Sequence, residues 1–102
     1  MRWYEVALRG ENFLLNLTGE PELLGFRVIH YVKAASEEEA VRIAMIQVRK
    51  NRHLSSALLN TPENPTRLIR ESVRRVWWRR SGRDGRYSYW SMDDSATIAH
   101  GT

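Results

Sequence analysis

The chain has 102 residues, of which 42% are hydrophobic and 27% are charged, proportions typical of one small globular domain. It contains no cysteine, which excludes a disulfide-stabilised scaffold, a thiolate zinc site and a cysteine nucleophile. No apolar run approaches the roughly 20 residues of a membrane span, and the N-terminus lacks the apolar core of a secretory signal. We therefore expect a cytoplasmic protein without membrane contact, with one domain over residues 1–92 and a flexible tail over residues 93–102.

Sixteen basic residues against twelve acidic residues give a formal net charge of +4. Basic and acidic residues cancel in residues 1–34 and again in residues 35–64. Residues 65–102 contain eight arginines and four acidic residues, so this last third has the whole excess. The first two thirds are therefore typical of a scaffold, and the last third favours an anionic partner.

Three segments near the N-terminus have apolar residues at every second position, which is the period of a strand with one buried face. Residues 3–9 have this pattern, and it resumes over residues 12–17, beyond Gly10. A glycine at the first position of a two-residue turn accepts a positive φ, so we predict a β-hairpin over residues 2–18. After a polar loop, residues 26–35 form the next predicted strand.

A helix start at Ser36 is the clearest local signal. Ser36 and Glu39 have the spacing of a capping box, in which the serine hydroxyl accepts a hydrogen bond from the Glu39 amide. Three glutamates then favour the positive end of the helix dipole, and Arg49 favours the negative end. We predict a helix of about fifteen residues packed on the sheet. Its apolar stripe comprises Ala40, Val41, Ile43, Ala44, Met45 and Val48.

The C-terminal half is less clear. Residues 53–65 contain two prolines and form a predicted connection, with a helical turn over residues 55–59 as an option. Residues 66–80 fit either an amphipathic helix or a strand with a bulge at Glu71. Asp84-Gly85 is a strong hairpin signal and precedes an aromatic segment with strand propensity. Because a hairpin needs a strand before its turn, we favour the strand.

These elements predict an α+β chain in the order β-β-β-α-β-β, with an antiparallel sheet of about five strands and one main helix packed on one face. One helix cannot cover five strands, so we expect the other face to be partly apolar and exposed. It would include Trp3, Ile29, Tyr31 and one or two of the tryptophans Trp77, Trp78 and Trp90. Exposed patches of this kind are typical of a partner surface, often one for a second copy of the chain.

Several segments together carry a family resemblance. They are Arg9-Gly10-Glu11-Asn12-Phe13, Gly25-Phe26 at a strand start, Ala35-Ser36-Glu37-Glu38-Glu39-Ala40, the connection at residues 60–65 and Tyr87-Ser88-Tyr89-Trp90. In this order they resemble a family of short, functionally uncharacterised bacterial proteins. The resemblance spans most of residues 5–92, and it implies a small α+β fold and a bacterial source. It implies no activity.

No motif for catalysis, a cofactor or a metal ion stands out. The sequence has no nucleophile elbow, no phosphate-binding loop and no dinucleotide fingerprint. We expect His30 to lie on the inward face of a strand, His53 to cap a helix C-terminus and His100 to lie in the tail. We therefore predict a non-enzymatic protein without a cofactor. A fold that placed His30 beside a carboxylate in a pocket would favour an enzyme instead.

The segment from Arg67 to Arg86 combines eight arginines with two acidic residues and several aromatic side chains. Arginines among stacking aromatics are typical of surfaces that hold single-stranded nucleic acid. Alternatively, the arginines are the solvated side of an amphipathic hairpin, with their stems over tryptophan. The candidate binding surface comprises Arg70, Arg74, Arg75, Trp77, Trp78, Arg79, Arg80, Tyr89 and Trp90.

Two functions follow from these observations. The first is a small binding or adaptor module that acts through protein contacts, as a homodimer or with another protein, using the open sheet face or an edge strand. The second is a nucleic-acid-binding module that uses the arginine-rich C-terminal hairpin. Salt distinguishes them, because nucleic-acid binding weakens steeply with salt whereas an interface built on tryptophan does not.

Overall fold

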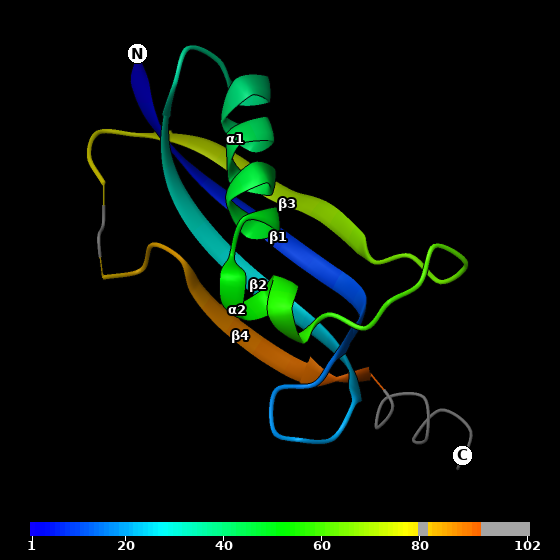
Figure 1. Cartoon of the computed structure of the whole chain (residues 1–102). Helices are drawn as coiled ribbons and strands as arrows, with labels where there is room; N and C mark the ends of the chain where they lie inside the picture. The colour runs from blue at the N-terminus through cyan, green and yellow to red at the C-terminus, as the bar shows by residue number, and fades with distance from the viewer. Residues whose placement is uncertain (80–81, 93–102) are drawn as a thin grey trace, which may run out of the picture.

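The computed structural model describes residues 1–79 and 82–92, and within them the chain forms four strands and two helices. In chain order these are β1 (Arg2–Leu15), β2 (Glu22–Ala34), α1 (Glu37–Arg49), α2 (Arg52–Ala57), β3 (Arg67–Val76) and β4 (Arg86–Ser91). The strands form one antiparallel sheet in the order β3-β1-β2-β4, and both helices lie on the same face of it (Figure 1). The α+β class is confirmed, whereas the prediction of five strands and one helix is wrong. The predicted tail lies outside the described residues.

The N-terminal hairpin predicted over residues 2–18 is instead one continuous strand, β1. The chain does not reverse at Gly10, because the positive φ, 60°, belongs to Asn12 and produces a bulge between Gly10 and Phe13. Polar groups hold the bulge: the Asn12 side-chain amide donates to Asn64 Oδ1 at 2.8 Å, and the Asn12 backbone carbonyl accepts from Asn60 Nδ2 at 2.9 Å. The extra residue shifts the alternation by one, which keeps the apolar side chains on both sides of the bulge on the helix face.

The predicted strand over residues 66–80 is confirmed as β3, but it does not form a hairpin with β4. β3 pairs with β1 and β4 pairs with β2, so the two strands lie on opposite edges of the sheet. Gly85 has the positive φ of a turn, 76°, and its amide donates to the Ile29 carbonyl at 2.8 Å. The Asp84-Gly85 turn therefore directs the chain onto β2. There Tyr87 and Tyr89 bury part of their rings against Phe26, at 5.2 and 6.0 Å between centroids.

A register shift in β3 falls at Glu71, where a bulge was expected. The bulge places Ile69 and Val73 on opposite faces of the sheet. Val73 pairs with Val6 and packs on the core, whereas Ile69 pairs with Arg9 on the face away from the helices.

Helix α1 begins as predicted, with the Ser36 hydroxyl accepting a hydrogen bond from the Glu39 amide at 3.1 Å. Its stripe of Ala40, Val41, Ala44 and Val48 is buried, and the small alanines allow the helix to approach the strands closely. The second helix, α2, occupies the first part of the predicted connection, residues 53–57, and so overlaps the helical turn that was considered over residues 55–59. Asn51 caps it by accepting from the Leu54 amide at 3.2 Å, and its Leu54 and Ala57 are buried.

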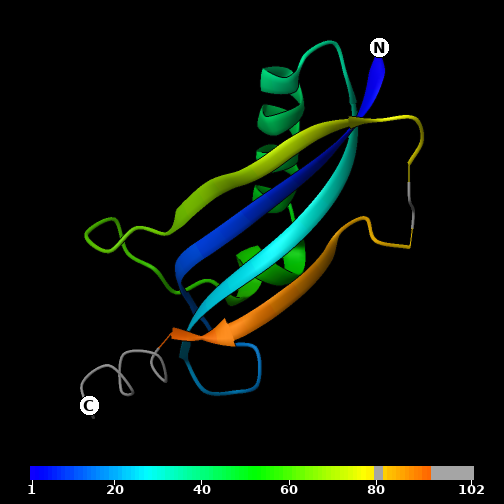
Figure 2. The same cartoon turned by 180° about the vertical axis from the view of Figure 1, so that it is seen from behind.

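The core lies between the helices and one face of the sheet. Val6, Leu8, Leu15, Phe26 and Val28 are its largest fully buried side chains. Within the described residues no helix or strand covers the other face, and Figure 2 shows the four strands from that side with the helices behind them. The sheet thus has one face buried under the helices and one face that no described helix or strand covers.

Candidate binding face on the uncovered side of the sheet

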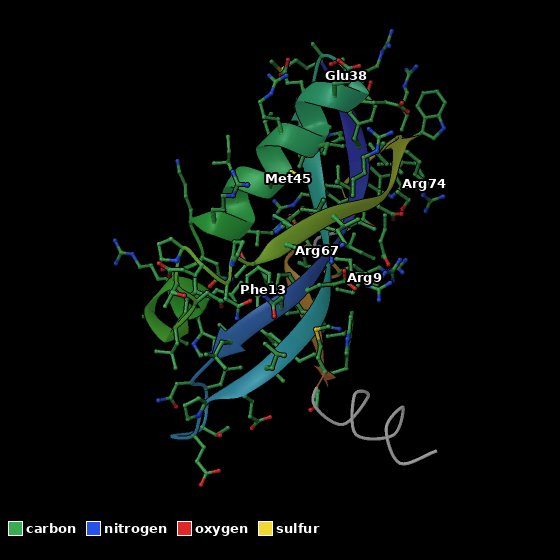
Figure 3. The ribbon with its side chains drawn as sticks, turned by 90° about the vertical axis from the view of Figure 1, so that its right-hand side faces the viewer. Arg9, Phe13, Glu38, Met45, Arg67 and Arg74 are labelled. Carbon is green, nitrogen blue, oxygen red and sulfur yellow. The ribbon has the colours of Figure 1, made fainter. Side chains whose placement is uncertain are left out.

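Residues that oppose one another across antiparallel strands share a face, so the pairing registers define the uncovered surface. We call it the open face. Its residues are Trp3, Glu5, Ala7, Arg9 and Glu11 of β1, Arg27, Ile29, Tyr31 and Lys33 of β2, Arg67, Ile69, Glu71, Ser72, Arg74 and Val76 of β3, and Arg86, Ser88 and Trp90 of β4. Figure 3 shows the sheet from its side, with Arg9 and Arg74 on one side of it and Glu38 and Met45 of α1 on the other.

The charge of the chain is concentrated on this face. Six of the basic side chains lie on it, and a seventh, Arg83, lies beside it next to Arg86. Among the described residues, three carboxylates lie on the face with these basic groups, those of Glu5, Glu11 and Glu71. The face itself therefore has an excess of three positive charges, and Arg83 beside it raises the excess to four.

A hydrogen-bonded cluster crosses the strands at Glu5. Arg74 donates to the Glu5 carboxylate from Nε at 2.8 Å and from Nη2 at 3.2 Å, and the Tyr31 hydroxyl donates to it at 2.6 Å. The Arg74 guanidinium is the main reason that the pKa of Glu5 falls from 4.5 to about 2, against the opposing effect of burial. This cluster links the edge strand β3 to the central strands β1 and β2 across the open face.

The remaining carboxylates neutralise only part of the other cations. Arg27 Nε lies 2.7 Å from Glu71, and Glu11 lies 3.2 Å from Arg9 and 3.7 Å from Arg67. Arg83 and Arg86 form no ion pair with any described residue. Exposed pairs of this kind contribute little stability, and the arginines in them keep free N–H donors for a ligand.

Two half-buried tryptophans lie toward opposite ends of the face, and each has a cation near its ring. The Lys33 ammonium lies 5.7 Å from the Trp3 ring centroid, and the Arg9 guanidinium lies 5.6 Å from that of Trp90. Trp90 lies over Gly25, where a Cβ atom would be only 2.4 Å from its indole nitrogen. The face thus combines cations with flat rings that can stack on a base.

The structure separates the residues of the predicted binding surface. Arg74 and Trp90 lie on the open face, but near opposite edges of the sheet. The other described members lie elsewhere: Arg70 and Arg75 on the helix side of β3, Trp77 and Trp78 in the connection after it, Arg79 paired with Asp84 at 3.0 Å, and Tyr89 stacked on Tyr87. Arg80 lies outside the described residues. Because β3 and β4 lie on opposite edges of the sheet, the described members of this set do not form one hairpin surface.

The candidate surface left out six basic residues of this region, which are Arg9, Arg27, Lys33, Arg67 and Arg86 on the face and Arg83 beside it. Three of them belong to the first third of the chain, where basic and acidic residues cancel. A signal was present, because polar and aromatic residues occupy the alternate positions of β1 and β2 that do not face the core. It identifies a face only when the strand pairing is known.

His30 lies beside a carboxylate, the feature that would have favoured an enzyme. Its Nδ1 atom is 3.2 Å from Asp84 Oδ1, but the ring is only 11% exposed and its Nε2 atom is buried without a hydrogen-bond partner in the described structure. Asp84 also accepts from the Tyr31 amide at 3.2 Å, so the pair fastens the connection before β4 to the edge of β2. The hollow that Asp84 lines does not include His30.

Comparisons with protein-family models, with curated proteins and with solved structures each found no match. The family resemblance described above therefore stays a prediction. Among the described residues, no group of three or more histidine, cysteine, aspartate or glutamate side chains is placed to hold a metal ion. Neither of the described helices has the length and apolar character needed to cross a membrane.

Proposed function

We propose that this chain is a cytoplasmic, non-enzymatic binding module whose open face holds single-stranded nucleic acid. The observation that carries the proposal is the excess of positive charge on one uncovered sheet face. Over the described residues the face has three excess positive charges, and Arg83 beside it supplies a fourth. An uncovered antiparallel sheet gives a flat surface for splayed bases, and guanidinium groups pair with phosphates. A second copy of the same face is disfavoured as the partner, because two such surfaces would repel each other.

The spacing of the two tryptophans fits an extended strand. Trp90 pairs with Gly25, next to the β1 bulge, whereas Trp3 lies at the start of β1. From the usual rise along a strand and the usual spacing between strands, the two rings lie roughly 25–30 Å apart. A single strand that crosses the face diagonally could stack one base on each ring and place phosphates over Arg9 and Lys33, the cations beside those rings.

The experiment measures binding of a fluorescently labelled single-stranded oligonucleotide by anisotropy over a range of salt concentrations. Arg9→Gln with Lys33→Gln should weaken binding about tenfold at low salt and lower the salt slope by roughly 1.4, because two phosphate contacts are lost. Arg70→Gln with Arg75→Gln is the matched control, since it removes the same charge from exposed residues on the helix side of β3. Trp3→Ala should cost about 1–3 kcal/mol of binding free energy through lost stacking.

Three results would overturn this function. The first is no oligonucleotide binding at low salt. The second is an equal loss in the two double variants, which would mean that only overall charge matters. The third is equally tight binding of an acidic polypeptide, which would assign the face to an acidic protein partner.

A second function, homodimerisation, is supported by the outer edge of β4. Edge strands are commonly protected from other chains by charge, and β3 has four arginines. β4 has one arginine, two tyrosines and a tryptophan over six residues. Antiparallel pairing of β4 with the same strand of a second copy would place the two Arg86 side chains at opposite ends of the new pair.

Sedimentation equilibrium tests the dimer. We expect dimers at high micromolar concentration, weakened by Ser88→Lys on β4 and unaffected by Ser72→Lys, the same change on the same face of β3. A monomer throughout the concentration range would contradict the dimer and would leave the nucleic-acid proposal intact.

A further inference from the structure

A hollow in the open face lies between β2 and β4. It has a volume of about 170 Å³ and is lined by Arg27, Ile29, Arg83, Arg86 and Ser88. The three arginines come from three parts of the structure: β2, the connection before β4, and β4 itself. None of these lining residues is acidic, so the hollow is surrounded by cations.

The strand register explains why the arginines meet here. Arg27 pairs with Ser88, and Ile29 pairs with Arg86, so Arg27 and Arg86 are diagonal neighbours whose Cβ atoms lie roughly 7–8 Å apart. The backbone beside Arg83 is fastened to β2, because Asp84 accepts from the Tyr31 amide and the Gly85 amide donates to the Ile29 carbonyl. The positions of the three side chains are thus set by the sheet and by its last turn.

The electrostatics of the hollow favour an anion. Arg83 and Arg86 have no acidic partner among the described residues, and Arg27 uses only Nε to reach Glu71, which leaves its terminal amino groups available. Arg83 lies close enough to Glu5 to help lower its pKa, but that carboxylate is already held by Arg74 and Tyr31. A guanidinium group can donate two parallel hydrogen bonds to two phosphate oxygens, and the Ser88 hydroxyl adds another donor.

We propose that this hollow is a subsite for a phosphate dianion, and that the bound strand supplies it as a terminal phosphate. The proposal rests on the proposed function for the source of the phosphate, although the hollow itself does not depend on it. A diester phosphate within the strand has one negative charge, whereas a terminal phosphate has nearly two at neutral pH. The charge of three guanidinium groups with free N–H donors is better matched by the terminal phosphate than by a diester phosphate.

The experiment compares oligonucleotides of one sequence and length that carry a 5′-phosphate, a 3′-phosphate or neither. Wild-type protein should bind one of the phosphorylated strands about tenfold more tightly than the strand without a terminal phosphate. Arg83→Gln with Arg86→Gln should abolish that preference, whereas the control Arg70→Gln with Arg75→Gln should keep it. Arg86→Lys, which keeps the charge but loses the paired donors, should reduce the preference. All of these side chains are exposed, and thermal unfolding confirms that the variants fold.

Inorganic phosphate supplies the second arm, followed by the amide shifts of Ile29 and Ser88 in NMR spectra. If oligonucleotides bind equally with and without a terminal phosphate, the subsite is refuted and the proposed function stands. If inorganic phosphate shifts these amide signals but no oligonucleotide binds, the phosphate subsite stands and the proposed function fails. The phosphate would then come from a small phosphorylated molecule. If neither ligand binds at low salt, both are refuted.

Discussion

Gly10→Ala tests the packing of the sheet, because Gly10 lies directly beneath an aromatic ring. A Cβ atom at this position would be 2.2 Å from Cε2 of Phe26, its cross-strand partner. Carbon atoms in contact are normally about 3.5–4.0 Å apart, so the ring would have to move by more than an ångström. Phe26 is fully buried, and Phe13 packs against it with 4.7 Å between ring centroids, which leaves the ring no free direction.

The expected loss follows from two opposing effects. Inserting a methyl group into a filled core typically costs about 1–3 kcal/mol. Replacing glycine with alanine returns about 0.4–1 kcal/mol, since the unfolded chain becomes less flexible. Gly10 does not have a positive φ, so no backbone strain adds to the cost. We expect the free energy of unfolding to fall by about 1–2.5 kcal/mol, and Tm to fall by about 4–8 °C for each of these kcal/mol.

Urea denaturation followed by circular dichroism measures this change. Gly82→Ala is the control, because no atom lies within 4 Å of the position that its Cβ would take. Gly25→Ala should cost less than Gly10→Ala, because its neighbour Trp90 is only half-buried. In a Phe26→Leu background, Gly10→Ala should cost much less than in wild-type protein. Equal costs in the two backgrounds would refute the argument, as would wild-type stability of Gly10→Ala itself.

Three further predictions concern polar contacts. The pKa of Glu5 is about 2 in the folded protein, against an ordinary value of 4.5. Its ion pair with Arg74 therefore stabilises the fold fully above pH 4.5, and this stabilisation is lost as the pH falls toward 2. In thermal unfolding from pH 6 to pH 2, Glu5→Gln should lose less stability on acidification than the wild-type protein does. Asp84→Ala leaves the Tyr31 amide without its acceptor and should cost about 1–3 kcal/mol in urea denaturation, and wild-type stability would show that the contact is unimportant. Ser36→Ala removes the cap of α1 and should cost about 1 kcal/mol, whereas Ser36→Gly should cost only a few tenths.

The sequence predicted the elements whose causes are local. Helix α1 begins at Ser36 because the capping hydroxyl and its donor lie three residues apart, and the apolar stripe needs no knowledge of distant residues. The sequence also predicted that β3 is a strand and that its pairing is irregular at Glu71. Helix α2 was largely missed. It is only six residues long and depends on burial of Leu54 and Ala57 against strands that come from other parts of the chain.

Strand pairing was not predictable, because it depends on contacts between residues that are far apart in the sequence. Gly10 resembles a turn residue, yet the conformation that matters belongs to Asn12, which is stabilised by Asn60 and Asn64 from a distant connection. Asp84-Gly85 does form a turn, but the partner of the following strand is β2 rather than β3. The same limit applies to the binding face, since Arg9 and Arg86 share a surface only through these pairings.

The strand order β3-β1-β2-β4 also determines the order in which the sheet can assemble. The two central strands are consecutive in the chain, and α1 follows them directly, so this part closes short loops. Each edge strand must find a partner distant in sequence, as in the pairing of Trp3 with Val76, and such contacts form slowly. We expect β1, β2 and α1 to make up the folding nucleus, with β3 and β4 joining afterwards at separate edges. The open face would then become complete only in the last steps of folding, because Arg86, Ser88 and Trp90 of β4 belong to it.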